Sequence, residues 1–426
     1  TKDLVALVDA KMEEQGKPKM SFFEVLTAMA IWKFADAPVD VAIVEVGMGG
    51  RWDATNVLDA DAAIIGPIDM DHMAWLGNTV EQIASEKVGI IKPSCTAVIG
   101  RQPHEEAVMP IIEEAARQNH ANLVRDGIEA EVVTRIPAVG GQVATLRTPN
   151  GTYAEVPIAK FGEHQAHNAL AALCAAEVVI PVNGALDGDL VAEALSTVRI
   201  PGRIEQIRTS PTIILDGGHN VNAAESLRAA IEENYDFQQL VGVIAMLGDK
   251  QVEEYLGVLE PLLSHVIVTE NSWRDRVMPA EDLKKIAERV FGAERVTCVP
   301  ELPDAIQEAV NMVDADDELG VGYGHGVLIC GSFTTAGDAR LMLEEKVNPD
   351  LKKPKSERVF QEAVEPEPRK DQDEADLDFE SDANPDFDIN DFGSVGPDLA
   401  ENEDTDVSED AADTERADDA SSDGVR

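Results

Sequence analysis

The stretch that decides the fold is Glu45-Val46-Gly47-Met48-Gly49-Gly50-Arg51-Trp52-Asp53-Ala54-Thr55-Asn56. It follows an apolar run, and residues 39–46 predict a buried parallel strand. A carboxylate at the end of such a strand, followed by glycines and then by Arg, Asp, Thr and Asn, is typical of an α/β enzyme. Such enzymes present metal ligands and polar substrate loops outside the carboxyl ends of their strands. An ordinary Gly-rich turn with solvated polar groups is the alternative interpretation.

Strands alternate with helices around this stretch. A helix is predicted over residues 20–34, capped by Ser21 with Glu24 three residues later, which is the pattern of a capping box. Further strands are predicted at 61–68 and 95–100, and further helices at 79–92, 104–119 and 163–180. Residues 121–160 contain short alternating runs between glycine turns and predict a small antiparallel excursion. The alternation indicates a parallel sheet covered on both faces.

The pattern restarts after Pro201-Gly202. The predicted strands lie at 212–215, 240–245, 266–268, 295–299 and 327–329, and the predicted helices at 221–233, 251–263, 280–290 and 302–313. We therefore expect a two-domain α/β protein. The first domain would span residues 1–199, a second, Rossmann-like domain residues 200–346, and a tail residues 347–426.

Charge and composition exclude several classes of protein. The net charge of −46 argues against nucleic acid or an anionic membrane as a partner. Residues 361–426 hold 25 Asp and Glu against four Lys and Arg, with few aliphatic residues, so we expect the tail to be disordered. The four cysteines are widely spaced, which favours free thiols in a reducing cytoplasm, and no apolar run reaches the length of a membrane span.

Three residues of the first domain are candidates for metal chemistry. Glu45 and His72 each follow a predicted strand, so together they could supply two ligands to Mg²⁺ or Mn²⁺, although a lone loop histidine is the alternative. Lys87 falls on the apolar stripe of its predicted helix. It could extend its ammonium to solvent, or burial could lower its pKa and let the neutral amine react with CO₂ to form a carbamate.

Nucleotide-binding candidates lie further along the chain. His164 and Asn168 occupy the first turns of the helix that starts near Gly162, where a phosphate or an ordinary cap would fit. Asp216 follows the first strand of the second domain and could hold a ribose hydroxyl or form a plain turn. Arg203 at the domain junction could reach a phosphate, or could be a surface arginine.

Read together, these segments resemble folylpolyglutamate synthase/dihydrofolate synthase, the folate branch of the ATP-dependent Mur ligase superfamily. The matching blocks cover roughly residues 1–345 and are, in order, SFFEVLTAMA, EVGMGGRWDATN, DMDHMAWLGNTVEQIASEKVGIIK, GEHQAHNALAAL, PGRIE and DGGHN. The resemblance implies a Mur-ligase-like fold with a parallel-sheet ATPase domain. It also implies ATP-dependent addition of L-glutamate to dihydropteroate or to folate through an acyl phosphate, by a cytoplasmic monomer.

The resemblance also implies roles for single residues. Glu45 and His72 match Mg²⁺ ligands, with K⁺ as a further ion, and Lys87 matches a carbamylated lysine. Asn168, Arg203 and Asp216 match ATP-binding positions, and His219 matches a catalytic block beside them. The positions that match the pteroate pocket are Ser21, Phe22, Phe23, Glu24, Trp52, Asp53 and Ala54.

One element of the family is absent from this sequence, the GxxxxGK[ST] loop that holds ATP phosphates. In the family this loop precedes the block of Glu45, so we expect the chain to be N-terminally truncated and inactive as given. A catalytically dead Mur-ligase-like binding module and a peptidoglycan Mur ligase are the alternatives. The SFFE helix and the GGRWDATN loop argue against a peptidoglycan enzyme.

Overall fold

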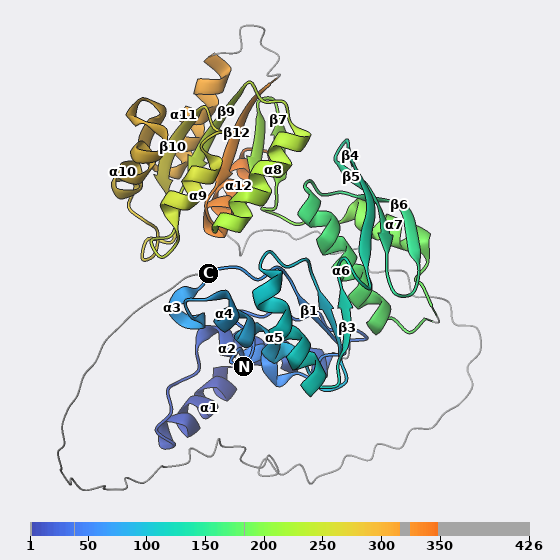
Figure 1. Ribbon diagram of the computed structural model, residues 1–426. Helices are drawn as coiled ribbons and strands as arrows, with labels where there is room; N and C mark the ends of the chain where they lie inside the picture. Colours follow the sequence, from blue (N-terminus) through green and yellow to red (C-terminus); the bar gives the residue numbers. More distant parts are fainter. Residues whose placement is uncertain (1, 38, 183, 316–323, 348–426) are drawn as a thin grey trace, which may run out of the picture. The chain divides into compact units, whose positions relative to one another are not determined.

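The computed structural model describes residues 2–37, 39–182, 184–315 and 324–347 (Figure 1). Their strands form two parallel-type sheets and one antiparallel sheet, so the predicted α/β fold class is confirmed. The predicted disorder of the acidic tail lies outside the described residues. The predicted domain boundaries at 199 and 346 stay predictions.

Two helices open the described chain, α1 (Lys2–Glu14) and α2 (Phe22–Asp36). The predicted capping box of α2 is confirmed. The Ser21 hydroxyl accepts from the Glu24 N–H at 3.2 Å, and the Glu24 carboxylate accepts from the Ser21 N–H at 2.6 Å. These contacts satisfy backbone N–H groups that a helix start leaves without partners. No side chain of α2 is buried, and Phe22 and Trp32 are among its exposed residues.

The first parallel sheet has the order β1 (Ala62–Ile65), β2 (Thr96–Ile99) and β3 (Asn122–Arg125). One face is covered by α4 (Val80–Lys87), by the short helix η2 (Val88–Ile90) that continues it, and by α5 (Glu105–Gln118). Ile65 and Ile99 from the strands pack there against Ile83 and Ile112 from the helices. This aliphatic packing agrees with the low aromatic content of the chain.

The opposite face of this sheet packs against α6 (Glu163–Val179). Beyond α6 lies the antiparallel sheet of β4 (Glu131–Ala138), β5 (Gly141–Arg147) and β6 (Thr152–Ile158), with α7 (Gly188–Thr197) packed on β6. Val98 of β2 and Leu170 of α6 share one buried core with Leu146 and Val156 of this sheet. The predicted antiparallel excursion is therefore confirmed, apart from β3, which joins the parallel sheet.

The second parallel sheet is larger. Its order is β11 (Val296–Glu301), β10 (His265–Glu270), β9 (Gln239–Ile244), β12 (His325–Cys330), β8 (Thr212–Leu215) and β7 (Glu205–Thr209). All neighbours pair in parallel except the edge strand β7, which is antiparallel to β8. Strand and helix alternate along this half of the chain, as predicted, and place helices on both faces of the sheet.

Successive side chains along a strand point to opposite faces of the sheet and pack against different helices. Ile214 packs with α8 (Val221–Asn234), α9 (Val252–Leu259) and α10 (Ala280–Phe291). Its neighbours Ile213 and Leu215 pack with α11 (Leu302–Ala315) and α12 (Phe333–Val347). The last short helix, η3 (Ala293–Arg295), leads into β11. This period of two is the geometry of a strand buried on both faces.

The predicted strand over residues 39–46 is wrong. Residues 41–46 adopt no regular secondary structure, and Val41, Ile43 and Val44 are exposed. A strand is stable only when a neighbour satisfies its backbone groups, and within the described residues β1 pairs with β2 alone. The apolar run therefore predicted the right composition for a buried strand but not the partner that a strand requires.

Smaller differences concern the ends of elements. The helix predicted over 79–92 ends as an α-helix at Lys87 and continues as η2, because Gly89 packs against the backbone of Arg51. The strand predicted over 61–68 ends at Ile65, before Gly66-Pro67. Neither β7 nor α7 nor α12 was predicted.

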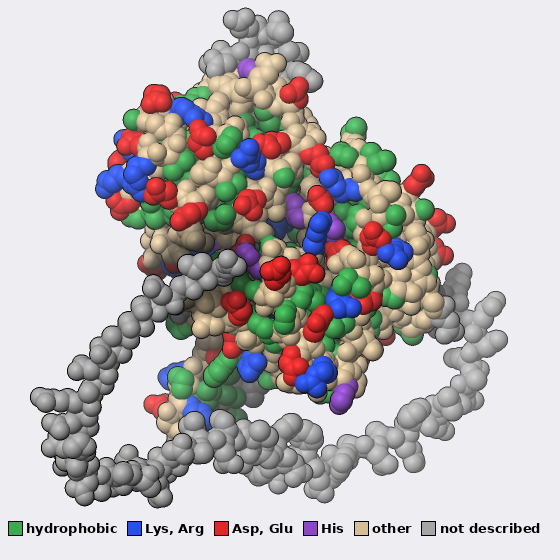
Figure 2. Space-filling model, viewed as in Figure 1, with side chains coloured by type: hydrophobic (Ala, Val, Ile, Leu, Met, Phe, Trp, Pro, Cys, Tyr) green, Lys and Arg blue, Asp and Glu red, His purple; other side chains and the backbone are tan. Residues whose placement is uncertain are grey.

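The surface carries mixed charges. Figure 2 shows acidic and basic side chains interspersed over the visible face. Exposed ion pairs occur on the surface, such as that of Arg289 with Glu253. Within the described residues no helix is long and apolar enough to cross a membrane.

Candidate functional site

Asp71 is the centre of a polar cluster. It lies in the loop between β1 and α3 (Met73–Leu76). Its Oδ1 accepts from the Lys250 ammonium at 2.8 Å, and its Oδ2 lies 3.3 Å from Nε2 of His219 and 3.4 Å from Nδ2 of Asn220. Burial would raise the pKa of Asp71, but the hydrogen bonds from His219 and Lys250 outweigh it and hold that pKa well below its usual range. Asp71 is therefore an anion that accepts hydrogen bonds from residues in the loops after β8 and β9.

His72 follows Asp71 and has a left-handed backbone, with a φ of 50°. That conformation is uncommon outside glycine, although histidine is enriched among the exceptions. Burial lowers the pKa of His72, Asp71 opposes the shift, and Lys250, His219 and Lys87 reinforce it. The His72 ring is therefore held neutral, the form in which an imidazole binds a metal ion.

Lys87 is the last residue of α4. Burial lowers the pKa of its ammonium, and Asp71 partly opposes the shift. The sequence left open whether Lys87 extends to solvent or loses its charge by burial. The lowered pKa favours the second alternative, because a partly desolvated lysine has a larger share of neutral, nucleophilic amine.

Glu45, the other predicted metal ligand, does not join this cluster. Its side chain is exposed, and its carboxylate takes part in none of the hydrogen bonds or ion pairs found among the described residues. Within the same residues, no group of three or more His, Cys, Asp or Glu side chains could hold a metal ion. The pairing of Glu45 with His72 on one metal ion therefore stays a prediction.

Asp216 lies directly after β8 and is 5% exposed. Its carboxylate accepts from the N–H of Ile204 at 3.0 Å and from that of Gly218 at 2.7 Å. Burial raises the pKa of Asp216, and these two backbone bonds oppose the shift. The side chain thus orders the loop that carries His219, which is the turn interpretation that the sequence left open.

Arg203 and His219 share an aromatic neighbour. The Arg203 guanidinium lies 4.2 Å from the centre of the Phe333 ring, and the ring of His219 lies 6.4 Å from it, edge to face. A cation–π contact of this kind limits the freedom of the arginine while leaving its N–H donors available. Arg203 is therefore better fixed than an ordinary surface arginine.

The start of α6 carries a second group of predicted residues. His164 is largely buried, and burial, reinforced by Arg203 and His167, lowers its pKa to about 4. Its Nε2 lies 3.1 Å from Nε2 of Gln165. Asn168, one turn along, is exposed and donates weakly to Oε1 of Gln165 at 3.4 Å. Asn168 is thus accessible, but the structure shows no contact between it and Asp216.

The Gly-rich loop has a fixed shape. Asp53 accepts from the N–H of Met48 at 2.9 Å with one oxygen, and from the N–H and hydroxyl of Thr55 with the other. It thereby caps the short helix η1 (Ala54–Val57), against which α2 packs. Phe23 lies over Gly47, where any side chain would meet its ring. Trp52, by contrast, is 85% exposed.

Three members of the cluster were not predicted as site residues: Asp71, Asn220 and Lys250. Each follows a strand of a parallel sheet, which is where such sheets carry their ligand-binding groups. The signal was present in Asp69-Met70-Asp71-His72 and in Leu247-Gly248-Asp249-Lys250. A rule that marks every polar residue after a buried strand would have found them.

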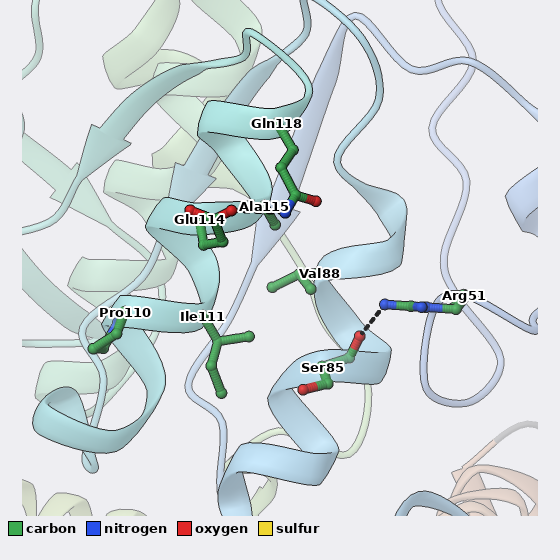
Figure 3. Close-up of a pocket in the computed structure, with 8 residues that line it drawn as sticks. All are labelled: Arg51, Ser85, Val88, Pro110, Ile111, Glu114, Ala115 and Gln118. Carbon is green, nitrogen blue, oxygen red and sulfur yellow. Dashed lines mark hydrogen bonds between the residues drawn. The ribbon is translucent and has the colours of Figure 1, made fainter.

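An open pocket lies elsewhere in the described part of the chain. It has a volume of about 340 Å³ and lies between α4 and α5 beside Arg51 (Figure 3). None of the predicted site residues lines it.

Comparison with known families identifies the class. The family model of the Mur ligase middle domain matches residues 4–176, and that of the Mur ligase glutamate ligase domain matches residues 202–333. Two α/β sheets with polar groups gathered after their strands agree with both matches. The fold is that of a Mur-type ligase.

Comparison with individual proteins identifies the family within this class. The chain is 44% identical to the dihydrofolate synthase/folylpolyglutamate synthase of Mycobacterium tuberculosis, over 80% of this chain and 72% of that protein. The protein of the same name from Escherichia coli is 32% identical, over 78% of this chain and 72% of that protein. The chain belongs to the dihydrofolate synthase/folylpolyglutamate synthase family.

Solved structures agree. Mycobacterium tuberculosis folylpolyglutamate synthase complexed with ADP and AMPPCP superposes with a TM-score of 0.74 at 43% identity, over 80% of this chain and 76% of that one. Escherichia coli FolC in complex with DHPP and ADP has a TM-score of 0.65 at 27% identity, over 78% and 73%. The expected two-domain Mur-ligase-like fold is thereby confirmed, and the peptidoglycan alternative is not favoured.

Proposed function

We propose that this chain is an ATP-dependent ligase that joins L-glutamate to dihydropteroate, to folate glutamates or to both, as a cytoplasmic monomer. The observation that carries the proposal is the cluster around Asp71. It brings the imidazoles of His72 and His219 and the ammonium of Lys250 next to one carboxylate. The names of the relatives support the choice of substrates.

The reaction has two steps. The acceptor carboxylate attacks the γ-phosphorus of ATP, so a carboxylate–phosphate bond forms and ADP leaves. The amine of glutamate then attacks the acyl carbon, loses a proton and expels phosphate, which leaves an amide. Both steps depend on positioning and on charge neutralisation at the transferring phosphoryl group.

The residues of the cluster suit this chemistry. Lys250 would offset negative charge on the phosphoryl group, because an ammonium is a compact point charge. The imidazole of His219 would accept the proton that the glutamate amine releases. Asn168, Arg203 and Asp216 would bind ATP, with Arg203 held by Phe333 for contact with phosphate.

The proposal also includes a requirement for metal ions. The neutral ring of His72 and a carbamate formed on Lys87 would supply two ligands to a divalent cation, and Glu45 is the third candidate ligand. Mg²⁺, when bound, would offset phosphate charge, and K⁺ is a further candidate ion. Without such ions, His72 and Lys87 still place a neutral imidazole and an amine of lowered pKa beside Asp71.

On the acceptor side, we assign the pterin-bearing substrate to two segments, Ser21–Glu24 and Trp52–Ala54. Ser21, Glu24 and Asp53 shape these segments through the hydrogen bonds described above. Phe22 and Trp52, which are 80% and 85% exposed, are the apolar surfaces that remain for an aromatic ligand.

Because the sequence lacks a GxxxxGK[ST] loop, the test uses the chain extended at its N-terminus by a segment that carries this loop. It measures ADP formation with three acceptors: dihydropteroate, a reduced folate and a UDP-linked muropeptide, each with L-glutamate. We expect ADP release with the first, the second or both, and none with the muropeptide. Hydroxylamine in place of glutamate should trap the acyl phosphate as a hydroxamate. Muropeptide-dependent turnover would overturn the proposal, and ATP and acceptor binding without ADP formation would instead identify a binding module.

A further inference from the structure

The end of helix α4 is attached to the Gly-rich loop by three hydrogen bonds. The Arg51 N–H donates to the Glu86 carbonyl at 2.9 Å, and Nη2 of Arg51 donates to the Ser85 carbonyl at 3.0 Å, which Figure 3 shows as a dashed line. The indole N–H of Trp52 donates to the Glu86 carboxylate at 3.1 Å. Two consecutive loop residues are therefore fixed to the last turn of one helix.

Close backbone contact makes this attachment rigid. A Cβ at Gly50 would lie 2.6 Å from the Glu86 carbonyl oxygen, and one at Gly89 would lie 2.6 Å from Cα of Arg51. Both distances are shorter than two non-bonded atoms allow, so the two segments touch through glycine on each side. The loop therefore keeps its place on the helix, and Glu86 is held where it meets Trp52.

Trp52 is unusual because it is both exposed and anchored. Its side chain is 85% exposed, yet its single polar atom already has a partner. An aromatic ring that is fixed before binding offers a large contact area at little further entropic cost. A surface tryptophan without a role gains nothing from such an anchor.

We propose that Glu86 is a positioning residue for the acceptor. Its carboxylate holds the indole of Trp52 so that the free face of the ring forms one wall for the bicyclic aromatic head group of the acceptor. This inference rests on the proposed function, because that function supplies a pterin-bearing acceptor. It goes further by giving a role to Glu86, which was not among the predicted site residues.

The position of Glu86 couples the acceptor to the reacting groups. Lys87 is the next residue, and its ammonium belongs to the Asp71 cluster. One turn of α4 thus holds the aromatic wall with one residue and presents the reactive lysine with the next. This turn therefore fixes the aromatic wall relative to the reactive lysine.

The test is a double-mutant cycle of Glu86→Ala with Trp52→Phe, measured on the full chain. Glu86→Ala should raise the Kd for dihydropteroate about three- to tenfold. Glu86→Gln, whose amide oxygen can still accept, should restore most of the loss. In the Trp52→Phe background, Glu86→Ala should have no further effect, because phenylalanine has no N–H to hold.

A second readout is spectroscopic. The difference between the fluorescence spectra of the wild type and Trp52→Phe isolates the emission of Trp52. Glu86→Ala should shift this emission and weaken its quenching by dihydropteroate, and Glu86→Gln should not. Glu81→Ala removes a carboxylate from the first turn of the same helix and serves as the matched control, with no change expected in either readout.

The outcomes separate the two claims. If wild-type chain binds dihydropteroate and Glu86→Ala binds it equally well, the positioning role is refuted and the proposed function stands. If Glu86→Ala weakens binding as much in Trp52→Phe as in the wild type, Glu86 acts on something other than Trp52 and the inference is also refuted. If the wild type binds no acceptor at all, the proposed function fails and the inference fails with it.

Discussion

The ammonium of Lys250 lies 2.8 Å from Oδ1 of Asp71, and the two residues are 179 positions apart in the sequence. Lys250 follows β9 and its side chain is only 8% exposed, whereas Asp71 follows β1 and is 25% exposed. Because neither charge is well solvated, each depends on the other. This pair joins the loops of the two parallel sheets within the unit of residues 1–359.

Breaking this pair should destabilise the protein. In Asp71→Asn the nearly buried ammonium of Lys250 loses its counter-ion, and we expect a loss of about 1–3 kcal/mol, reduced from the fully buried case by the exposure of Asp71. Urea unfolding monitored by circular dichroism measures the change. The double variant of Asp71→Asn with Lys250→Met should lose less free energy of unfolding than the sum of the losses in the two single variants.

Asp249→Asn is the matched control for this prediction. It removes a carboxylate one residue from Lys250, from a pair with Arg276 that has a similar distance of 2.9 Å but is about half exposed. An exposed pair contributes about 0–1 kcal/mol. Equal losses in Asp71→Asn and Asp249→Asn would show that burial does not strengthen the first pair.

The Asp71 cluster shows where sequence interpretation reaches its limit. His72 and Lys87 were identified because each stands out locally, one after a strand and one on an apolar stripe. Asp71 and Lys250 are ordinary loop residues until the two sheets bring them together, and no local pattern records a contact over 179 positions. The roles of all the predicted site residues stay predictions, because contacts alone do not establish them.

His164 should make stability depend on pH on the acid side. Its pKa in the folded protein is about 4, below the usual value of about 6.5 in the unfolded chain. The unfolded state therefore binds the proton first, so stability is full above pH 6.5 and falls as the pH drops towards 4. Between pH 7 and pH 5 we expect a loss of roughly 2 kcal/mol in the wild type that is absent from His164→Gln.

His120→Asn is the control for this measurement. His120 is exposed, and its left-handed backbone, with a φ of 51°, is one that asparagine tolerates. The free energy of unfolding of His120→Asn should fall between pH 7 and pH 5 by as much as that of the wild type. If His164→Gln also matches the wild type between pH 7 and pH 5, the buried neutral state of His164 is wrong.

His167, one turn from His164, should act in the opposite direction. The hydrogen bond to Asp126, 2.5 Å from its Nδ1, raises the pKa of His167, with burial opposing and Glu163 adding to the shift. A raised pKa contributes stability that is complete below the unfolded value and is lost as the pH rises through the folded value. His167→Gln should therefore flatten the stability curve above about pH 6.5. A wild-type curve that is already flat from pH 6.5 to pH 8 would contradict the assignment.

Gly50→Ala should detach the Gly-rich loop from α4. The new methyl group would lie 2.6 Å and 2.9 Å from the carbonyl oxygens of Glu86 and Lys87, and backbone atoms cannot move aside. We expect a loss of about 1–3 kcal/mol in urea unfolding, together with a change in Trp52 fluorescence. Gly257→Ala in α9, where nothing lies within 4 Å, is the control and should be neutral or stabilising by about 0.5–1 kcal/mol. A stable Gly50→Ala with unchanged fluorescence would show that the loop does not need this contact.

Local signals predicted local structure well. The Ser21–Glu24 capping box and the alternation of strands and helices after residue 200 involve neighbours in sequence, and the structure confirms them. The strand over residues 39–46 failed because pairing is a property of two segments, whereas an apolar run belongs to one. The edge strand β7 was missed for the converse reason, because its exposed residues give no apolar pattern.

Lys87 supports the last prediction, which concerns its modification. Burial lowers the pKa of its ammonium and so raises the fraction of neutral amine that can add to CO₂. With ¹³C-labelled bicarbonate, the wild type should show a carbamate resonance that acidification removes. Lys87→Arg should lack it, because a guanidinium stays protonated.

Activity should follow the carbamate. In the protein extended by a segment that carries the GxxxxGK[ST] loop, Lys87→Ala should lose most of its ADP formation. Added short carboxylates, which stand in for the missing anion, should restore part of it. Lys92→Ala is the control for the loss of a lysine nearby, since the Lys92 ammonium donates to the Asn56 carbonyl at 2.7 Å and has no part in the cluster. Because the carbamate would replace a cation with an anion beside His72, the pKa of His72 should rise when bicarbonate is added. If the pKa of His72 does not change when bicarbonate is added, and the carbamate resonance persists in Lys87→Arg, the modification lies on another lysine.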